Sequence, residues 1–225
     1  MFQITPAFSV PLVYAKLDDH AELNRQLRDL FLAREAEGDK YRNPEPIVSR
    51  NKQLFESNFR LFDWPQPACA KLRDFCWANL YRAIGELNGY DRAMLMKLHI
   101  QHQSWFHITR RGGFFGAHNH AMHSWSGVYC VKHDGDDPAS DSGRLTFINP
   151  QASATMYLDM ALANMKPPYA MSPRSLRLEP GQLVIFPSWL LHEVLPFEGE
   201  GERITVAFNA RFMLDGAQPL DVPLG

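Results

Sequence analysis

The hydrophobic pattern of the chain changes at about residue 97, and this change narrows the choice of fold. From there on, apolar and polar residues alternate in short runs, which is typical of β-strands with one buried face. Eight short strands with glycine and proline turns between them favour a jelly roll, because two sheets that fold over each other leave few edges exposed. The strands are expected at 99–110, 115–121, 124–132, 143–149, 175–179, 182–187, 191–196 and 203–212.

The first 96 residues are predicted to be mainly helical. Residues 18–34 carry leucines at helical spacing after Asp18 or Asp19, either of which can cap a helix. A second helix is expected to begin near Asp63-Trp64-Pro65 and to stop at Gly89. We therefore expect a single domain over residues 1–225, in which residues 1–96 support a mainly β, double-stranded β-helix (cupin-like) core at 97–212.

Composition and charge exclude several classes of protein. The formal net charge of −2 and the absence of Lys/Arg runs argue against a nucleic-acid partner. There is no run of about 20 apolar residues that would span a membrane. Three cysteines without a C-x-x-C pair are typical of reduced thiols, so we expect a cytoplasmic protein. The sequence leaves the oligomeric state open, and a homo-oligomer is compatible with it.

Residues 150–172 form a long insertion between two of the expected strands. Long loops of this kind are typical of lids or substrate walls.

Histidines cluster in the segment from Gly116 to His123. Residues two apart in a strand point to the same face, so His118 and His120 present two imidazoles side by side. This spacing is used by the first two ligands of a facial metal triad. His123 falls on the other face unless the strand has already ended.

A further histidine, His192, follows the apolar strand that ends at Pro187 and opens the next strand. A third metal ligand would have to come from such a place if the metal lies between strands near one mouth of a barrel. Without the upstream pair, the same residue would be interpreted as a histidine at a turn.

Arg203 lies on a strand whose residues alternate between two faces, and Thr205 shares its face. A buried unpaired arginine is costly, and an incoming carboxylate would satisfy it with two charge-assisted hydrogen bonds. The alternative is a rim arginine that pairs with Glu198 or Glu202.

Taken together, these residues resemble the 2-oxoglutarate/iron(II) oxygenase superfamily, and more narrowly its bacterial and phage family of jelly-roll 2-oxoglutarate-Fe(II) oxygenases. The resemblance covers residues 97–212. The matching segments are Trp105-Phe106-His107, Gly112-Gly113, His118-x-His120, Ser126-Gly127-Val128-Tyr129, Gly143-x-Leu145-x-Phe147, Pro180-Gly181, Phe186-Pro187-Ser188-Trp189-x-x-His192 and Arg203-Ile204-x-Val206-x-Phe208-Asn209.

The resemblance implies a hydroxylase that uses Fe(II), 2-oxoglutarate as cosubstrate and O2. Its prime substrate is undefined and is either a small molecule or a protein side chain. In these terms the metal ligands and catalytic residues are His118, His120 and His192. The cosubstrate carboxylate is bound by Arg203, with Thr205 and Tyr129 as hydroxyl donors.

The chain departs from the superfamily at one ligand, because Asp or Glu usually stands where this sequence has His120. Three neutral imidazoles leave the iron its full double charge, whereas a carboxylate would cancel one unit. Two interpretations stay open: His120 is the third ligand, as in three-histidine thiol dioxygenases, or it lies beside the metal and water takes its place. His123 is the alternative third histidine.

Two other classes of function stay open as well. One is a cupin-like, three-histidine metal dioxygenase or isomerase that does not use 2-oxoglutarate. The other is an inactive jelly-roll binding module. Arg203 discriminates between the oxygenase and the cupin-like protein, since only the oxygenase needs it in the pocket. Metal content after purification discriminates between the oxygenase and the inactive binding module.

Overall fold

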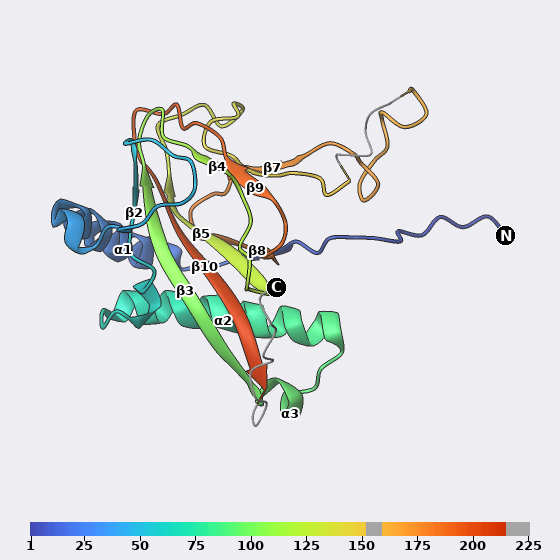
Figure 1. The fold of residues 1–225 in the computed structure, drawn as a ribbon, viewed down its shortest axis with the longest axis horizontal. Coiled ribbons are helices and arrows are strands. Elements are labelled where there is room, and N and C mark those ends of the chain that lie inside the picture. Colours follow the sequence, from blue (N-terminus) through green and yellow to red (C-terminus); the bar gives the residue numbers. More distant parts are fainter. Residues whose placement is uncertain (152–158, 215–225) are drawn as a thin grey trace.

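Two antiparallel β-sheets form the centre of the molecule in the computed structural model, which describes residues 1–151 and 159–214 (Figure 1). In the described residues the larger sheet has the strand order β1-β8-β5-β10-β3-β2, and the smaller sheet has the order β4-β9-β6-β7. The fold is therefore a jelly roll, as the alternation predicted. The strands are β1 Val13–Lys16, β2 Leu54–Glu56, β3 Leu98–Thr109, β4 Phe115–His118, β5 Trp125–His133, β6 Leu145–Phe147, β7 Arg174–Leu176, β8 Gln182–Pro187, β9 His192–Val194 and β10 Arg203–Leu214.

Helices α1 (His20–Ala36) and α2 (Pro67–Asn88) lie against the larger sheet (Figure 1). On α1, Leu23, Leu27 and Phe31 follow one another at four-residue spacing and are all buried. Phe31 stacks on Phe106 of β3 with 4.1 Å between the ring centroids. One apolar cluster thus joins the helices to this sheet, and a second, smaller cluster lies between the two sheets.

Helix α2 begins later than the sequence predicted. Leu61–Asp63 forms a 3-10 turn (η2), and the proline in the first turn of the helix is Pro67, with Gln66 at the N-cap. The predicted end is confirmed, because Gly89 takes the left-handed conformation (φ 68°) that favours glycine. A short helix, α3 (Arg92–Leu95), and a 3-10 turn, η1 (Gly38–Lys40), complete the described helical segments.

The first 96 residues are more than a helical support, because they contribute two strands to the larger sheet. Strand β1 pairs with β8, and β2 pairs with β3. Of the insertion expected at 150–172, residues 152–158 lie outside the described residues, and most of the rest is exposed.

Strands β3 and β10 pair along their whole lengths, from Arg203↔Thr109 to Leu214↔Leu98. Their neighbours are shorter, since β5 pairs with β10 only as far as Ala210. The two strands therefore run on past the rest of the sheet as a two-stranded ribbon, which Figure 1 shows crossing α2 and ending near α3.

None of the helices in the described residues has the length and apolar character needed to cross a bilayer.

Candidate metal and cosubstrate site

His118, His120 and His192 come together at one end of the smaller sheet. His118 ends β4 and lies directly opposite His192, the first residue of β9. His120 lies two residues beyond the end of β4, where its backbone N–H donates to the Ser188 carbonyl at 2.9 Å. Nitrogen atoms of the three rings all lie within 4.8 Å of one another.

Backbone carbonyls fix the orientation of two of these rings. Nδ1 of His118 lies 2.7 Å from the Gly116 carbonyl oxygen, and Nδ1 of His192 lies 2.8 Å from that of Leu190. A carbonyl oxygen only accepts, so each Nδ1 carries the proton and each Nε2 keeps its lone pair. Metal-binding histidines are held in this way by partners of their second nitrogen.

The surroundings keep these imidazoles neutral. Burial lowers the pKa of His192 to about 3, and the neighbouring His118 adds to this effect. Burial also lowers the pKa of His120 to about 2, with further contributions from the charges of His192 and His118. Unprotonated nitrogen is the form that binds a metal ion.

The cluster fits a divalent metal with nitrogen ligands. Two nitrogens that each bind one ion at about 2.1 Å lie no more than about 4.2 Å apart, so small ring movements would bring these three into coordination. Among the described residues the cluster contains no carboxylate. His123 is not part of it: the residue is half-buried, and its Nδ1 is 3.1 Å from the Ala121 carbonyl oxygen.

A buried hydroxyl network holds the turn that leads to His192. Ser126 Oγ on β5 donates to Asn209 Oδ1 on β10 at 2.8 Å, and it lies 2.8 Å from Ser188 Oγ. All three side chains are buried. The network links the turn after β8 to strands β5 and β10. It therefore helps to fix the position at which β9 begins with His192.

Arg203 lies deeper in the barrel and is only 3% exposed. Its Nη1 contacts Thr205 Oγ1 at 3.5 Å, and burial lowers the pKa of the guanidinium. Among the described residues, no carboxylate oxygen lies within 4 Å of its nitrogens. The hydroxyl of Thr109, the residue opposite Arg203 on β3, is also buried without a hydrogen-bond partner in the described structure.

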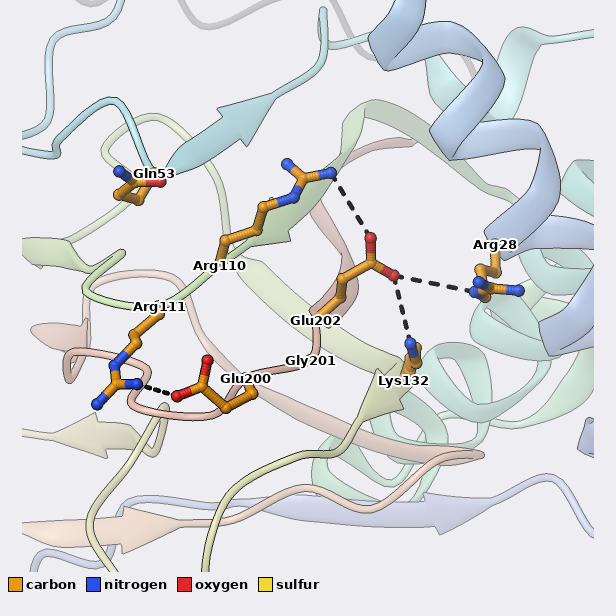
Figure 2. Close-up of a pocket in the computed structure, with 8 residues that line it drawn as sticks. All are labelled: Arg28, Gln53, Arg110, Arg111, Lys132, Glu200, Gly201 and Glu202. Atoms are coloured by element: carbon orange, nitrogen blue, oxygen red, sulfur yellow. Dashed lines mark hydrogen bonds and ion pairs between the residues drawn. The ribbon is translucent and has the colours of Figure 1, made fainter.

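Glu202 does not neutralise Arg203, because other cations surround it (Figure 2). Its carboxylate lies 3.3 Å from Lys132, 3.6 Å from Arg110 and 3.9 Å from Arg28. The alternative of a rim arginine paired with Glu198 or Glu202 is therefore wrong, because Arg203 is buried and, among the described residues, forms an ion pair with neither. The nearby carboxylate of Asp136, whose charge raises the pKa of Arg203, pairs with Arg177 and His133. A buried guanidinium with no carboxylate within ion-pair distance favours an anionic ligand.

One narrow cavity connects the histidines to Arg203. Its free volume is about 30 Å³, roughly the share of one water molecule in the liquid, so a ligand of several carbons must displace side chains as it binds. The cavity is lined by Trp105, His107, Phe115, His118, His120, Ser126, Gly127, Val128, Leu145, Phe186, His192, Val194, Arg203, Thr205, Ala207 and Phe208.

The structure also has a larger groove of about 550 Å³, which contains none of the three histidines. Its charged side chains pair with one another, as Figure 2 shows for Arg111 with Glu200 and for the cations around Glu202. We therefore place the candidate site in the narrow cavity.

Tyr129 is not a cosubstrate residue in this structure. Its ring lies on the helix side of the larger sheet, where its hydroxyl donates to Asn24 Oδ1 of α1 at 2.7 Å. Its neighbour in β5, Val128, faces the cavity instead. Successive residues of a strand point to opposite faces, so Tyr129 lies on the face away from the cavity. The expectation that its hydroxyl faces the cosubstrate differs from this structure.

Two residues of the matching segment Trp105-Phe106-His107 form the wall of the cavity beside the histidines. The Trp105 indole N–H donates to Nε2 of His107 at 3.1 Å, and the Trp105 ring makes an edge contact with His120 at 5.7 Å. Burial lowers the pKa of His107 to about 3. Their spacing of two residues indicates that they share one face of a strand. Only the pairing of β3 with β10 shows that this face lines the cavity.

Comparison with known families agrees with this site. Residues 103–209, from the middle of β3 to β10, match the family described as "Putative 2OG-Fe(II) oxygenase". This part of the chain is a 2OG-Fe(II) oxygenase domain. The family uses Fe(II), 2-oxoglutarate and O2, and the matched segment includes all three histidines and Arg203.

Solved structures with the same fold include several oxygenases. A prolyl-4-hydroxylase from Pseudomonas putida is 18% identical, with 89% of this chain and 91% of that chain covered and a TM-score of 0.56. AviO1 from Streptomyces viridochromogenes Tue57 is 14% identical, with 94% of this chain and 92% of that chain covered and a TM-score of 0.60. HygX from Streptomyces hygroscopicus, bound to nickel, 2-oxoglutarate and hygromycin B, is 10% identical, with 90% of this chain and 83% of that chain covered and a TM-score of 0.50.

A search of curated proteins finds no significant match to the oxygenase domain or to the rest of the chain.

Proposed function

We propose that this oxygenase binds Fe(II) through His118, His120 and His192 and binds 2-oxoglutarate through Arg203, and that it hydroxylates a prime substrate. The observation that carries the proposal is the pairing of two features in one cavity. A buried guanidinium without a carboxylate partner lies in the same narrow space as three converging neutral imidazoles.

The three histidines would hold the iron, and their neutral state leaves the metal's double charge uncancelled. Iron with 2-oxoglutarate and O2 supplies the oxidising chemistry. The protein's part is orientation: the carbonyls of Gly116 and Leu190 keep the Nε2 atoms of His118 and His192 turned toward the ion.

Arg203 would bind the carboxylate of 2-oxoglutarate that lies farther from the metal. Thr205 Oγ1 already contacts the guanidinium, and it offers a hydroxyl donor to the same carboxylate. Because Arg203 is buried and apolar side chains such as Val128 and Phe208 line the cavity, the ion pair would form largely away from water. Binding requires movement of the lining side chains.

The test is an anaerobic titration with Fe(II) and then 2-oxoglutarate, followed by the metal-to-ligand charge-transfer absorption. Arg203→Ala leaves the carboxylate without its partner, at a cost on the order of 2–5 kcal/mol, or about 30-fold or more in affinity. Arg203→Lys keeps the charge, loses the two-pronged geometry and should restore only part of the affinity. Arg111→Ala, in the exposed groove, is the control that should change nothing.

Iron binding should survive in all these variants, because Arg203 is not a ligand. If wild-type protein binds iron but no 2-oxoglutarate, or if Arg203→Ala binds 2-oxoglutarate as tightly as wild type, the cupin-like alternative replaces this proposal. The observation that favours the cupin-like alternative is that, among the described residues, the cluster of three histidines contains no carboxylate.

The prime substrate is left to experiment, since oxygenases of this fold differ widely in what they act on. One similar structure is named a prolyl-4-hydroxylase and another has hygromycin B bound. For location we keep the cytoplasm as our prediction; the three cysteines, Cys69, Cys76 and Cys130, are all free and buried, which is compatible with a reducing compartment.

A further inference from the structure

The face of the β3–β10 ladder that lines the cavity continues outside the barrel. Directly opposite residues of an antiparallel pair share a face, and here the pairs Thr205↔His107 and Ala207↔Trp105 lie inside the cavity. The next pairs on the same face are Asn209↔Gln103, Arg211↔Gln101 and Met213↔His99. We call the surface formed by Gln101, Gln103 and Arg211 the outer ladder face.

The outer ladder face is polar and open. Gln101, Gln103 and Arg211 are all exposed, whereas the opposite side of the ribbon packs on α2 through residues such as Ile100 and Phe212. Arg211 Nε donates to Gln101 Oε1 at 2.7 Å, and Gln101 Nε2 lies 2.8 Å from Met213 Sδ. The arginine is therefore held along the ribbon and presents the rest of its guanidinium to solvent.

This surface adjoins the loop that carries His120. The loop reaches the ribbon through the Ser124 N–H, which donates to the Ala210 carbonyl at 2.9 Å. His123, in the same loop, lies close enough to Arg211 for the two to interact: burial lowers the pKa of His123, the Ala121 carbonyl raises it, and the charge of Arg211 lowers it again. The outer ladder face thus borders the loop that carries one of the three histidines of the proposed metal site.

The charge on this face is positive. Among the described residues, no carboxylate oxygen lies within 4 Å of Arg211, in contrast to the paired arginines of the exposed groove. The six residues that alternate along the ribbon on this side include no Asp or Glu. Such a surface complements an anion, with glutamine amides as additional donors.

We propose that the outer ladder face binds the prime substrate and that this substrate carries a carboxylate or phosphate group held by Arg211. Arg211 is four residues beyond Ala207, the pair of Trp105, so the anionic group would lie roughly 13 Å along the strand from the wall beside the metal. The proposal rests on the function proposed above, because it takes the histidine cluster as the metal site.

The test uses the protein loaded with Mn(II) in place of Fe(II) and saturated with 2-oxoglutarate. Inorganic phosphate and [1-13C]propionate are the two probes, and paramagnetic relaxation of phosphorus or carbon measures binding and distance. We expect saturable relaxation at a metal–nucleus distance on the order of 10–15 Å. The probe that binds more tightly identifies phosphate or carboxylate as the preferred group.

The variants are Arg211→Gln, Arg211→Lys and Arg82→Gln. Arg211→Gln should weaken binding of the preferred probe about threefold or more, the range for exposed charge contacts, and Arg211→Lys should weaken it less. Arg82 on α2, whose side chain is 78% exposed and pairs with Glu86, is the control for the loss of a surface arginine and should have no effect. Non-saturable relaxation in wild type, or equal binding by Arg211→Gln, overturns this inference alone; a failure to take up Mn(II) and 2-oxoglutarate overturns the proposed function with it.

Discussion

His120 differs from its two partner histidines in how its ring is held. His118 and His192 donate through Nδ1 to backbone carbonyls, whereas the His120 ring, among the described residues, is restrained by ring contacts such as that with Trp105. It also lies beyond the end of β4, so its position depends on the backbone bond to Ser188. The same-face argument therefore does not apply to His120, which lies outside the strand, although its ring lies with those of His118 and His192.

If His120 is the third ligand, His120→Ala should lower Fe(II) affinity about tenfold or more, since even residues that only support a ligand cost 10–100-fold. His123→Ala is the matched control: the same loop loses an imidazole that the structure leaves outside the cluster, so iron affinity should stay at the wild-type value. The measurement is anaerobic equilibrium titration with Fe(II). Equal losses in the two variants would remove His120 from the ligand set.

The alternation of side chains along strands explains both the success and the main error of the sequence-based prediction. Alternation within a strand identifies which residues share a face, and a strand overlaps each of the eight predicted segments, with ends that differ by up to three residues. Alternation does not reveal which face looks into the barrel, because that depends on pairing between distant strands. Tyr129 was assigned to the cavity for this reason, although it packs against α1.

This assignment of faces predicts opposite outcomes for two hydroxyl residues. Tyr129→Phe removes a group bonded only to Asn24 in the described structure, so 2-oxoglutarate affinity should not change, while thermal stability should fall because Asn24 is left buried without this partner. Thr205→Val removes the hydroxyl next to Arg203 and should weaken 2-oxoglutarate, by roughly tenfold for a lost hydrogen bond of about 1.5 kcal/mol. Affinities for 2-oxoglutarate come from the charge-transfer titration. A lower affinity in Tyr129→Phe than in wild type would return this residue to the cosubstrate site.

Short elements without a periodic pattern could not be predicted. Strands β1 and β2 have four and three residues, too few to show alternation. Both gain their strand conformation from pairing with longer strands, β8 and β3. Arg203 illustrates the same limit within the site: its burial, and the engagement of Glu202 by other cations, are properties of the folded barrel.

On the scale of the whole molecule, the proposed ligands should stabilise the fold, because they join parts that are distant in the sequence. The metal would connect β4 to β9, and 2-oxoglutarate would connect that metal to Arg203 at the start of β10. A ligand that binds only the folded state at 100 times its dissociation constant adds about 2.7 kcal/mol to the free energy of unfolding. For a chain of 225 residues this corresponds to a rise of about 5–10 °C in Tm.

Thermal unfolding with Fe(II) and 2-oxoglutarate added in turn, under anaerobic conditions, separates the two contributions. Wild-type protein should show one rise in Tm with the metal and a second with 2-oxoglutarate. Arg203→Ala should keep the first and lose most of the second, whereas His192→Ala should lose both, because 2-oxoglutarate needs the metal as well as the arginine. A chelator should return wild-type protein to its metal-free Tm. A second rise that persists in Arg203→Ala would mean that 2-oxoglutarate binds elsewhere, and the cavity between the histidines and Arg203 would no longer be its site.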